Sequence, residues 1–386
     1  MCVKRGTVKL STYTADVSGV CSALYELGGM VVIHDPSGCN STYNTHDEPR
    51  WYDMDSLVFI SGLSLMDAIM GNDEKFIEEI VRAAEELSPG FIALVRTPVP
   101  FMTGTDFEAI AGILEEKTKL PVYYFPTTGM HSYVKGVGMA LEMVAKHMVQ
   151  ELEKSSKRRD DSINILGATP LDFSVNTTIS SLKKALESEF HILSTFAMGS
   201  RPDEITKAGE ASVNLVISSA GLPAARVLRE RFGTPYVIGM PVEGLLTKAI
   251  SLLKTGSRTG KCQVLYDRKK NQDRTDPVYV IGEAVVSQSL KEAIFQKTGM
   301  RVRVLCPLEA ERECVAPGMI LKKEEEEIRR ELIGATMVIA DPIYQEVCPP
   351  DCSFISLPHE AYSGRIYRKQ IPDFLHIFSD LSLQSQ

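Results

Sequence analysis

Residues 29–39 read GMVVIHDPSGC, and this stretch determines how the rest of the chain is interpreted. A short apolar run that ends in turn-forming residues is typical of a buried strand. Pro36 and Gly38 then predict a tight turn that holds Cys39 at the end of a sheet, where backbone amides favour the thiolate. Such a sulfur suits metal or cluster ligation, and an ordinary buried thiol is the alternative that these residues leave open.

Similar apolar runs alternate with segments of helical periodicity along the whole chain, which is typical of strand-helix-strand units that build parallel sheets. Two polar stretches, KSSKRRDD at 154–161 and DRKKNQDRTD at 267–276, divide the runs into three blocks of four. We therefore predict an α/β protein of three Rossmann-like domains, 1–158, 159–268 and 269–386, each with a four-stranded parallel sheet flanked by helices. The predicted strands lie within residues 30–36, 56–63, 90–97, 121–128, 162–170, 190–198, 213–221, 234–244, 277–285, 300–307, 335–342 and 353–361.

Apolar residues at spacings of three and four predict helices over 66–87 and 106–119, and a long amphipathic helix over 133–155. The predicted strands end in small or polar residues, such as GATP, SSAG and ADP. Ligands of open parallel sheets bind outside the carboxyl ends of the strands. Three such domains therefore predict a central cleft into which their loops converge.

Composition excludes several classes of protein. The chain has 386 residues, which is more than one hydrophobic core normally serves, and a formal net charge of -8, which disfavours binding to a nucleic-acid backbone. No apolar stretch approaches the roughly 20 residues of a membrane span, and the first residues lack the apolar region of a secretory signal. We expect a cytoplasmic protein whose eight cysteines are buried thiols, metal ligands or redox groups rather than a disulfide framework.

Two glycine-rich stretches resemble nucleotide motifs only superficially. In GSRTGKC, residues 256–262, the glycine spacing is too short for a phosphate loop, and Cys262 stands where Ser or Thr would meet magnesium. We interpret it as the end of a helix. Gly136 and Gly138 lack the third glycine of a dinucleotide fingerprint and are expected to let a helix pack closely. If ATP or NAD is used, a partner handles it.

Several stretches together resemble the nitrogenase component 1 superfamily. They are GVCSALYELGGMVVIHDPSGC at 19–39, MDAIMGNDEKFIEEI at 66–80, VRTPVPFMTGTDFEAI at 95–110, YFPTTGMHSYVKGVGMAL at 124–141, INILGATPLDF at 163–173 and ERFGTPYVIGMPVEGLLT at 230–247. The superfamily includes nitrogenases, their cofactor-assembly scaffolds, tetrapyrrole reductases and the reductive cyclase of nickel-tetrapyrrole biosynthesis. The resemblance implies an iron-sulfur cluster at a dimer interface and an ATP-dependent iron protein as electron donor.

The resemblance carries over Cys39 as the principal cluster ligand. Cys21, 18 residues earlier, is either a second ligand or a helix-packing residue, and Pro98 stands where many relatives have a third cysteine. A four-iron cluster needs four ligands, and a two-fold axis duplicates what each chain offers. We therefore expect a [4Fe-4S] cluster held by Cys21 and Cys39 of two identical chains, as in the homodimeric cyclase type, with a heterodimer of paralogues as the alternative.

Other residues are weaker candidates. His131, His359, Arg365 and Arg96 are catalytic candidates because they flank strand ends or glycine loops, and Arg96 could share the space around His359. His34 and His46 occupy similar positions. In PHEAYSGRIY, residues 358–367, the donors suit an anionic or tetrapyrrole carboxylate, unless Arg365 simply pairs with an acid such as Glu360.

Cys348 and Cys352 form a C-x3-C pair, interpreted as two loop thiols stiffened by prolines, with a metal or redox pair as the alternative. Cys306 is expected in the core. The sequence thus predicts a reductase subunit. It does not specify the substrate, for which a tetrapyrrole or another metallocofactor is an option. A non-catalytic scaffold for cofactor assembly and a cluster-free ligand-binding protein are the alternatives.

Overall fold

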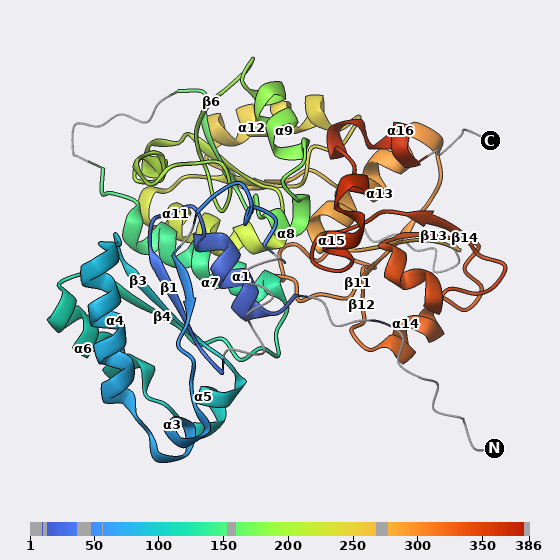
Figure 1. The fold of residues 1–386 in the computed structure, drawn as a ribbon. Coiled ribbons are helices and arrows are strands. Elements are labelled where there is room, and N and C mark those ends of the chain that lie inside the picture. Colours follow the sequence, from blue (N-terminus) through green and yellow to red (C-terminus); the bar gives the residue numbers. More distant parts are fainter. Residues whose placement is uncertain are drawn as a thin grey trace, which may run out of the picture.

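The structure is a computed structural model, and it describes Leu10 and residues 14–36, 48–55, 57–152, 160–267 and 277–381. It contains three parallel sheets, one from each predicted block (Figure 1). The α/β prediction with three sheets flanked by helices is therefore confirmed. Strand content differs in one respect, because two of the sheets have five strands instead of four.

The first sheet has the order β2-β1-β3-β4, formed by β1 (Met30–His34), β2 (Val58–Ile60), β3 (Ile92–Arg96) and β4 (Val122–Phe125). Alternate residues of β1 point to opposite faces, as strand geometry requires. Met30 and Val32 pack against α4 (Asp73–Leu87) and α6 (Phe107–Thr118), whereas Val31 and Ile33 pack against α1 (Asp16–Leu24) and α7 (Tyr133–Met143). Figure 1 shows α4 and α6 on the outer side of this sheet.

The second sheet has the order β6-β5-β7-β8-β9 and the third β12-β11-β10-β13-β14. Their extra strands, β9 and β12, are two residues long and lie at the edges. The strands are β5 (Ser162–Leu166), β6 (His191–Thr195), β7 (Val213–Val216), β8 (Tyr236–Ile238), β9 (Gln263–Val264), β10 (Val278–Ile281), β11 (Arg303–Cys306), β12 (Ile320–Leu321), β13 (Met337–Ala340) and β14 (Ser353–Ser356). The helices around them are α8 (Pro170–Phe173), α9 (Thr178–Leu186), α10 (Pro202–Ile205), α11 (Leu222–Phe232), α12 (Leu246–Thr259), α13 (Ala284–Thr298), α14 (Glu325–Glu331), α15 (Gly364–Tyr367) and α16 (Ile377–Leu381).

Two helices of the first block differ from their predictions. The helix expected over 66–87 is two helices, α3 (Leu65–Met70) and α4, because Gly71 adopts a left-handed φ of 70° that ends α3. The helix expected over 133–155 is regular only in α7, and a π-helical turn, Val144–Met148, follows it. Moreover, α7 is buried on most of its circumference instead of being amphipathic, since it lies between the first sheet and α11.

Helices α1 and α7 pack at unusually short range. A Cβ atom on Gly136 would lie 1.9 Å from the carbonyl oxygen of Asp16, and one on Gly19 would lie 2.3 Å from that of Tyr133. The expectation that the glycines of α7 allow close packing is therefore confirmed for Gly136. The other glycine-rich stretch is also a helix end, as expected, because α12 stops at Thr259 and Gly260 caps it with a φ of 68°.

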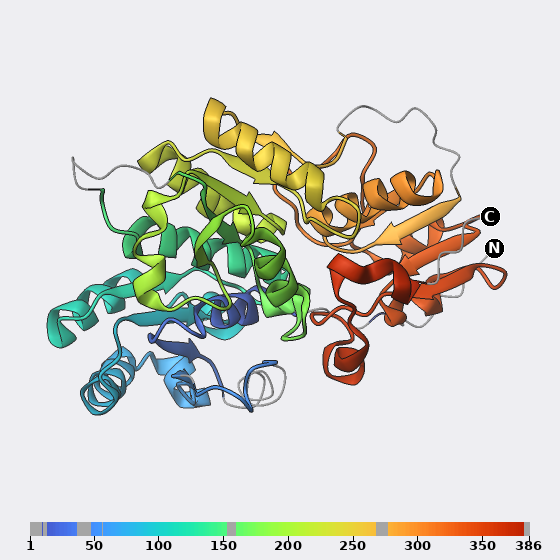
Figure 2. The same cartoon turned by 90° about the horizontal axis from the view of Figure 1, so that it is seen from above.

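The three blocks share buried core. One cluster of buried apolar side chains joins Val137 of α7, Leu222 of α11 and Cys306 of β11. At the other end of the third block, the ring of Phe374 packs edge-on against Phe173 of the second block. Figure 2 shows the first two blocks side by side and the third next to them. The domain boundaries at 158 and 268 remain predictions. No helix among the described residues is both long and apolar enough to cross a bilayer.

Candidate functional site

A cavity of about 570 Å³ lies where the three blocks meet. Its walls come from α7 of the first block, from α11 of the second block and from the loop that follows β11 in the third. These lining residues follow the carboxyl ends of β4, β7 and β11, which is where ligands of parallel sheets bind. Its volume is within the range of about 300–1,000 Å³ that small-molecule sites occupy. The central cleft expected from the strand ends is therefore present.

The predicted candidate His131 lies on the wall of this cleft, where it meets Glu309 from the third block. Glu309 accepts hydrogen bonds from His131 Nδ1 at 2.9 Å, from the Ser132 N–H at 2.8 Å and from the Ser132 hydroxyl at 2.7 Å. Lys323 adds an ion pair at 2.9 Å. Burial by itself would raise the pKa of Glu309, but these hydrogen bonds outweigh it and lower the pKa to about 2. Glu309 is thus a fixed anion in the wall.

The cleft also offers donors that the protein itself does not satisfy. Ser219 is fully buried, and its hydroxyl oxygen has no hydrogen-bond partner among the described residues. Lys135 is exposed on the same wall, and no ion pair joins it to any described residue. Arg226, in contrast, is held by Glu311 and Glu313. Apolar surface from Val134, Met139 and Pro223 lies between these polar groups.

A buried junction joins one residue from each block. The Tyr133 hydroxyl at the start of α7 donates to Asp172 Oδ1, and His359 Nε2 lies 3.4 Å from the same oxygen. The N–H of Ala361 donates to His359 Nδ1 at 3.2 Å, so Nδ1 is an acceptor and Nε2 carries the proton that faces Asp172. The other carboxylate oxygen, Oδ2, is buried without a partner among the described residues. His359 therefore lies at the centre of the fold.

Glu283 forms the next layer of this junction. It precedes α13 and accepts hydrogen bonds at 2.9 Å from the N–H groups of Ser219, Val285 and Val286. Burial, and secondarily the charge of Asp172, raises its pKa. Cys306, at the end of β11, is fully buried as expected, and burial raises its pKa to about 12. Glu283 thus fixes the backbone of Ser219 in the wall of the cleft, and Cys306 belongs to the buried core.

Of the two cysteines expected to bind a cluster, the structure describes Cys21 but not Cys39. Cys39, like His46, lies outside the described residues. Cys21 lies in the middle of α1, is fully buried in the core and has a pKa raised by that burial, with Glu48 adding to the effect. A thiol in that setting resists forming the thiolate that ligates iron. Helix packing is thus the role that its surroundings support. No group of three or more His, Cys, Asp or Glu able to hold a metal ion occurs in the described part of the chain.

The segment that contains Cys39 is anchored on both sides. Before it, Asp35 Oδ1 accepts a hydrogen bond from the Thr97 hydroxyl at 2.6 Å. After it, the guanidinium of Arg50 is buried and forms ion pairs of 2.7 Å with both Glu26 and Glu48. Arg50 Nη2 also donates to the Ser22 carbonyl oxygen at 2.7 Å. Both ends of the Cys39 segment are therefore fixed to the first sheet and α1.

The family model described as nitrogenase component 1 type oxidoreductase matches residues 18–250, which is more than half of the chain. The chain belongs to this family. The match spans the Cys39 segment and the walls of the cleft that come from the first two blocks. It confirms the resemblance that the sequence motifs indicated.

Relatives of this component 1 type chain are about one quarter identical to it over the aligned stretches. It is 26% identical over 312 residues to the nitrogenase iron-molybdenum cofactor biosynthesis protein NifE of Rhodobacter capsulatus, covering 78% of this chain and 63% of that protein. It is 25% identical over 175 residues to a light-independent protochlorophyllide reductase subunit of Nostoc punctiforme, covering 43% of this chain and 34% of that protein. The matches therefore span about a third to two thirds of these relatives' own lengths.

The fold of this component 1 type chain is also that of a solved nitrogenase. The structure of nitrogenase Cp1 at pH 6.5 aligns over 92% of this chain and 86% of its own, with a TM-score of 0.65 and 13% identity. At that identity the likeness establishes the shared fold alone. All three sheets of the chain are included in an alignment of this extent.

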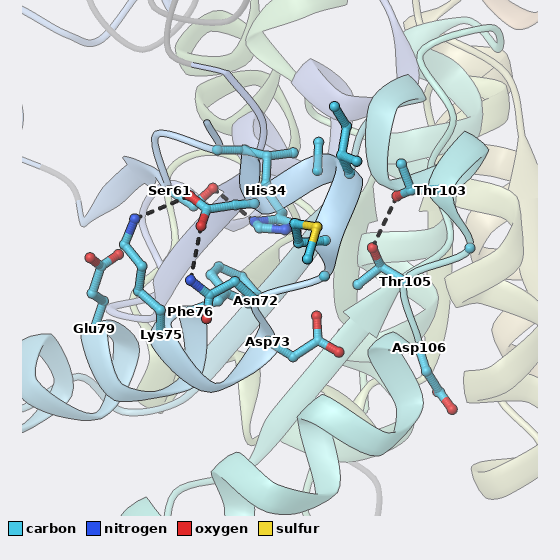
Figure 3. Close-up of a pocket in the computed structure, with 17 residues that line it drawn as sticks. His34, Ser61, Asn72, Asp73, Lys75, Phe76, Glu79, Thr103, Thr105 and Asp106 are labelled. Atoms are coloured by element: carbon cyan, nitrogen blue, oxygen red, sulfur yellow. Dashed lines mark hydrogen bonds and ion pairs between the residues drawn. The ribbon is translucent and has the colours of Figure 1, made fainter. Parts of the chain in front are cut away.

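This component 1 type chain has a second cavity, of about 380 Å³. It lies at the end of β1, shortly before the Cys39 segment begins. Figure 3 shows the imidazole of His34 directed toward Ser61 on its wall, and the Nδ1 to Oγ distance is 2.8 Å. The ring of His34 lies 4.0 Å from that of Phe76. Burial lowers the pKa of His34 to about 4, and Asp67 only partly opposes this effect. His34 is therefore neutral near pH 7.

Two further candidates are Arg96 and Arg365. Arg96 is not among the residues that line the cleft: its Nε donates to the Thr127 carbonyl oxygen at 3.1 Å and its guanidinium lies 4.7 Å from the centre of the Phe101 ring. The Arg365 side chain is outside the described part of the structure. Arg368 forms an ion pair with Glu360 at 2.6 Å.

Sequence reasoning missed Tyr133, Asp172, Ser219, Glu283 and Glu309 as members of the site. Each lies just beyond the carboxyl end of an observed strand, so the strand-end rule contained a signal for all five. That rule alone could not rank them, because many polar residues at strand ends merely cap helices. Their roles depend on contacts between blocks far apart in the sequence.

Proposed function

We propose that this chain is a subunit of a nitrogenase-like oxidoreductase that binds an iron-sulfur cluster through Cys39 at a subunit interface. Electrons from an ATP-dependent iron protein reach a substrate in the interdomain cleft through this assembly. Support comes from the family match over residues 18–250, which includes Cys39 and most of the cleft. Bound thiolates and their surroundings set the potential of such a cluster.

The burial of Cys21 changes the assembly that we favour. Two copies of the chain would bring two Cys39 thiolates, whereas a four-iron cluster takes four protein ligands. With Cys21 enclosed in α1, a homodimer with two ligands per chain lacks support. The heterodimer with a paralogue is therefore the better proposal, in which a non-identical subunit supplies the remaining ligands.

A surface near the Cys39 segment suits such an interface. Helix α3 has no buried residue, and four of its apolar side chains are between 65% and 76% exposed: Leu65, Met66, Ile69 and Met70. Clustered apolar exposure of this kind marks protein–protein contact surfaces. Both α3 and His34, which lies shortly before the Cys39 segment, border the 380 Å³ cavity. One partner protein could therefore cover α3 and the Cys39 segment together.

The chemistry of the cleft favours an anionic substrate with an apolar body. Lys135 and the Ser219 hydroxyl supply donors without protein partners in the described structure, and Met139 and Pro223 supply apolar surface. A tetrapyrrole with carboxylate side chains has this combination of groups, as do some metallocofactors. Binding would give the buried Ser219 hydroxyl a hydrogen-bond partner, which is a favourable exchange.

Metal content tests the cluster proposal. We expect tagged chain isolated anaerobically with its native partners to contain iron and acid-labile sulfide. Cys39→Ser should lose most of both, whereas the matched variant Cys21→Ser should retain them because Cys21 is enclosed by the core. Wild-type protein free of iron, or equal iron in Cys39→Ser and wild type, would contradict the proposal. Equal losses in both variants would restore Cys21 as a ligand.

A second candidate function is a non-catalytic scaffold that holds a metallocofactor precursor. It is favoured by the relatives described as cofactor biosynthesis proteins. The two candidates differ in turnover. A reductase with reduced iron protein, ATP and a chlorin-type tetrapyrrole forms more than one product per chain, whereas a scaffold retains one bound molecule per site without converting it.

A further inference from the structure

Cys348 and Cys352 form a pair of neighbouring thiols in the third block. They lie in the loop between the short 3-10 helix η5 (Pro342–Val347) and the edge strand β14. The Cys352 N–H donates to the Pro349 carbonyl oxygen at 3.1 Å, which closes a tight turn over the intervening residues. Each thiol also affects the pKa of the other. Together with the turn, this mutual effect indicates that the two thiols are neighbours.

The two thiols have different surroundings. Cys348 is the inner one, and its Sγ–H donates to the Tyr344 carbonyl oxygen at 3.3 Å. Cys352 lies closer to solvent, where its Sγ contacts the Ser353 carbonyl oxygen at 3.5 Å. Burial raises the pKa of Cys348 to about 12, with the neighbouring Cys352 adding to it. Burial also raises the pKa of Cys352, and the neighbouring Cys348 opposes that effect. Cys352 is thus the more accessible thiol, which a reagent reaches first.

The loop is already restricted before any bond forms between the sulfurs. Its three intervening residues are Pro349, Pro350 and Asp351, and proline fixes the backbone φ angle. A restricted loop loses little conformational freedom on closure. Both thiols also pack against one cluster of buried side chains in the third block, which includes Tyr344 and Val347.

We propose that Cys348 and Cys352 are a reversible dithiol–disulfide site that exchanges with small-molecule disulfides. The Cys352 thiolate attacks one sulfur of the small disulfide, forms a mixed disulfide and releases one small thiol. Cys348 then loses its proton and attacks Sγ of Cys352, which forms the intrachain bond and releases the second small thiol. The protein loses two electrons and two protons, and the small disulfide gains both.

This site is connected to the interdomain junction through the chain on both sides. Asp341, which precedes η5, accepts hydrogen bonds from the His359 N–H at 2.8 Å and from the Ser363 hydroxyl. Strand β14 leads from Cys352 to the same His359. Disulfide formation removes the hydrogen bond from Cys348 to Tyr344, whose ring packs against Tyr362 at 5.7 Å. The pair thus lies on the same stretch of chain that holds His359.

The test is intact-mass analysis and peptide mapping of the full-length chain, reduced and then treated anaerobically with excess oxidised glutathione. We expect the wild type to lose two hydrogen atoms in mass, with the link located between Cys348 and Cys352 and reversed by dithiothreitol. Cys348→Ser should stop at the mixed disulfide with glutathione. Cys352→Ser should remain unmodified at residue 348.

Cys262→Ser is the matched control, because Cys262 is a partly buried thiol of the second block that contacts Arg229. It should form the Cys348–Cys352 bond as the wild type does. Wild-type protein that keeps glutathione on Cys352, or whose Cys348 and Cys352 peptides stay separate after exhaustive treatment, would overturn the proposal. These masses do not depend on a bound cluster, so the result is independent of the proposed function.

Discussion

Glu309 of the third block accepts two hydrogen bonds from Ser132 of the first, at 2.8 Å from its N–H and 2.7 Å from its hydroxyl. Ser132 is fully buried and immediately precedes α7, which lines the cleft. One carboxylate therefore fixes the start of a central helix to a loop from a block 177 residues further along the chain. This arrangement makes the cleft sensitive to the charge of Glu309.

We predict that Glu309→Gln lowers the free energy of unfolding at pH 7 by about 1–3 kcal/mol, as is typical for hydrogen bonds to a charged group. The pKa of Glu309 falls from 4.5 to about 2 on folding, so its stabilisation is complete above pH 4.5 and lost as the pH falls through about 2. Urea unfolding of both proteins at several pH values checks this, and the difference in unfolding free energy should narrow below pH 4.5. Glu327→Gln, which alters an exposed pair, is the control. A gap independent of pH would contradict the prediction.

Replacing Arg50 by Met should destabilise the protein by about 3–5 kcal/mol, since it leaves the carboxylates of Glu26 and Glu48 without their cation. Chemical denaturation at pH 7 measures the loss. Arg201→Met is the matched control, because the pair that Arg201 forms with Asp203 is exposed and should contribute less than about 1 kcal/mol. Similar effects of the two substitutions would show that the buried network does not have the role assigned to it.

Two glycine substitutions should have opposite effects. Gly136→Ala places a methyl group 1.9 Å from the Asp16 carbonyl oxygen, so α1 and α7 must separate, at a cost of about 3 kcal/mol or more. Gly112→Ala in α6 meets nothing within 4 Å and should stabilise the helix by about 0.5–1 kcal/mol. Thermal unfolding distinguishes them. A tolerated Gly136→Ala would mean that the two helices are not in such close contact.

His34 should make stability depend on pH between about 4 and 6.5. Folding lowers the pKa of His34 from its ordinary value of 6.5 to about 4. Between these two pH values the unfolded chain therefore binds a proton at His34 more readily than the folded protein does. The contribution is complete above pH 6.5 and is lost as the pH falls toward 4, by about 3 kcal/mol at 1.36 kcal/mol per unit. His34→Gln should therefore show a shallower loss of stability in this interval in urea titrations. An unchanged slope would indicate that His34 is protonated in the folded state.

The sequence predicted twelve of the fourteen strands found in the described structure. The two that it missed, β9 and β12, contain two residues each, too few for an apolar run to stand out. The break between α3 and α4 was missed for a different reason. Apolar residues occur at helical spacing on both sides of a polar stretch, residues 71–75, and the helix is interrupted there by the non-helical backbone of Gly71 and Asn72.

The sequence predicted a cleft at the strand ends but not the polar residues that meet there. The strand-end rule located the cleft because it depends on topology, which the alternation of strands and helices reveals. Asp172 was missed because it contacts Tyr133 and His359, 39 and 187 positions away in the sequence, and no local pattern encodes such a meeting. Cys21 shows the reverse case, since its spacing from Cys39 was visible but its burial in α1 was not.

The meeting of Tyr133, Asp172 and His359 at a single carboxylate oxygen also restricts how the molecule can open. A hinge rotation of any one block would break a contact at this oxygen and leave a buried charge short of hydrogen bonds, which is costly. A ligand of the proposed site would therefore enter without large rigid-body movement, past side chains of the cleft wall such as Arg226 and Glu311, which pair at 2.8 Å. Its entry would then depend on a partly exposed ion pair, so salt should accelerate both binding and release.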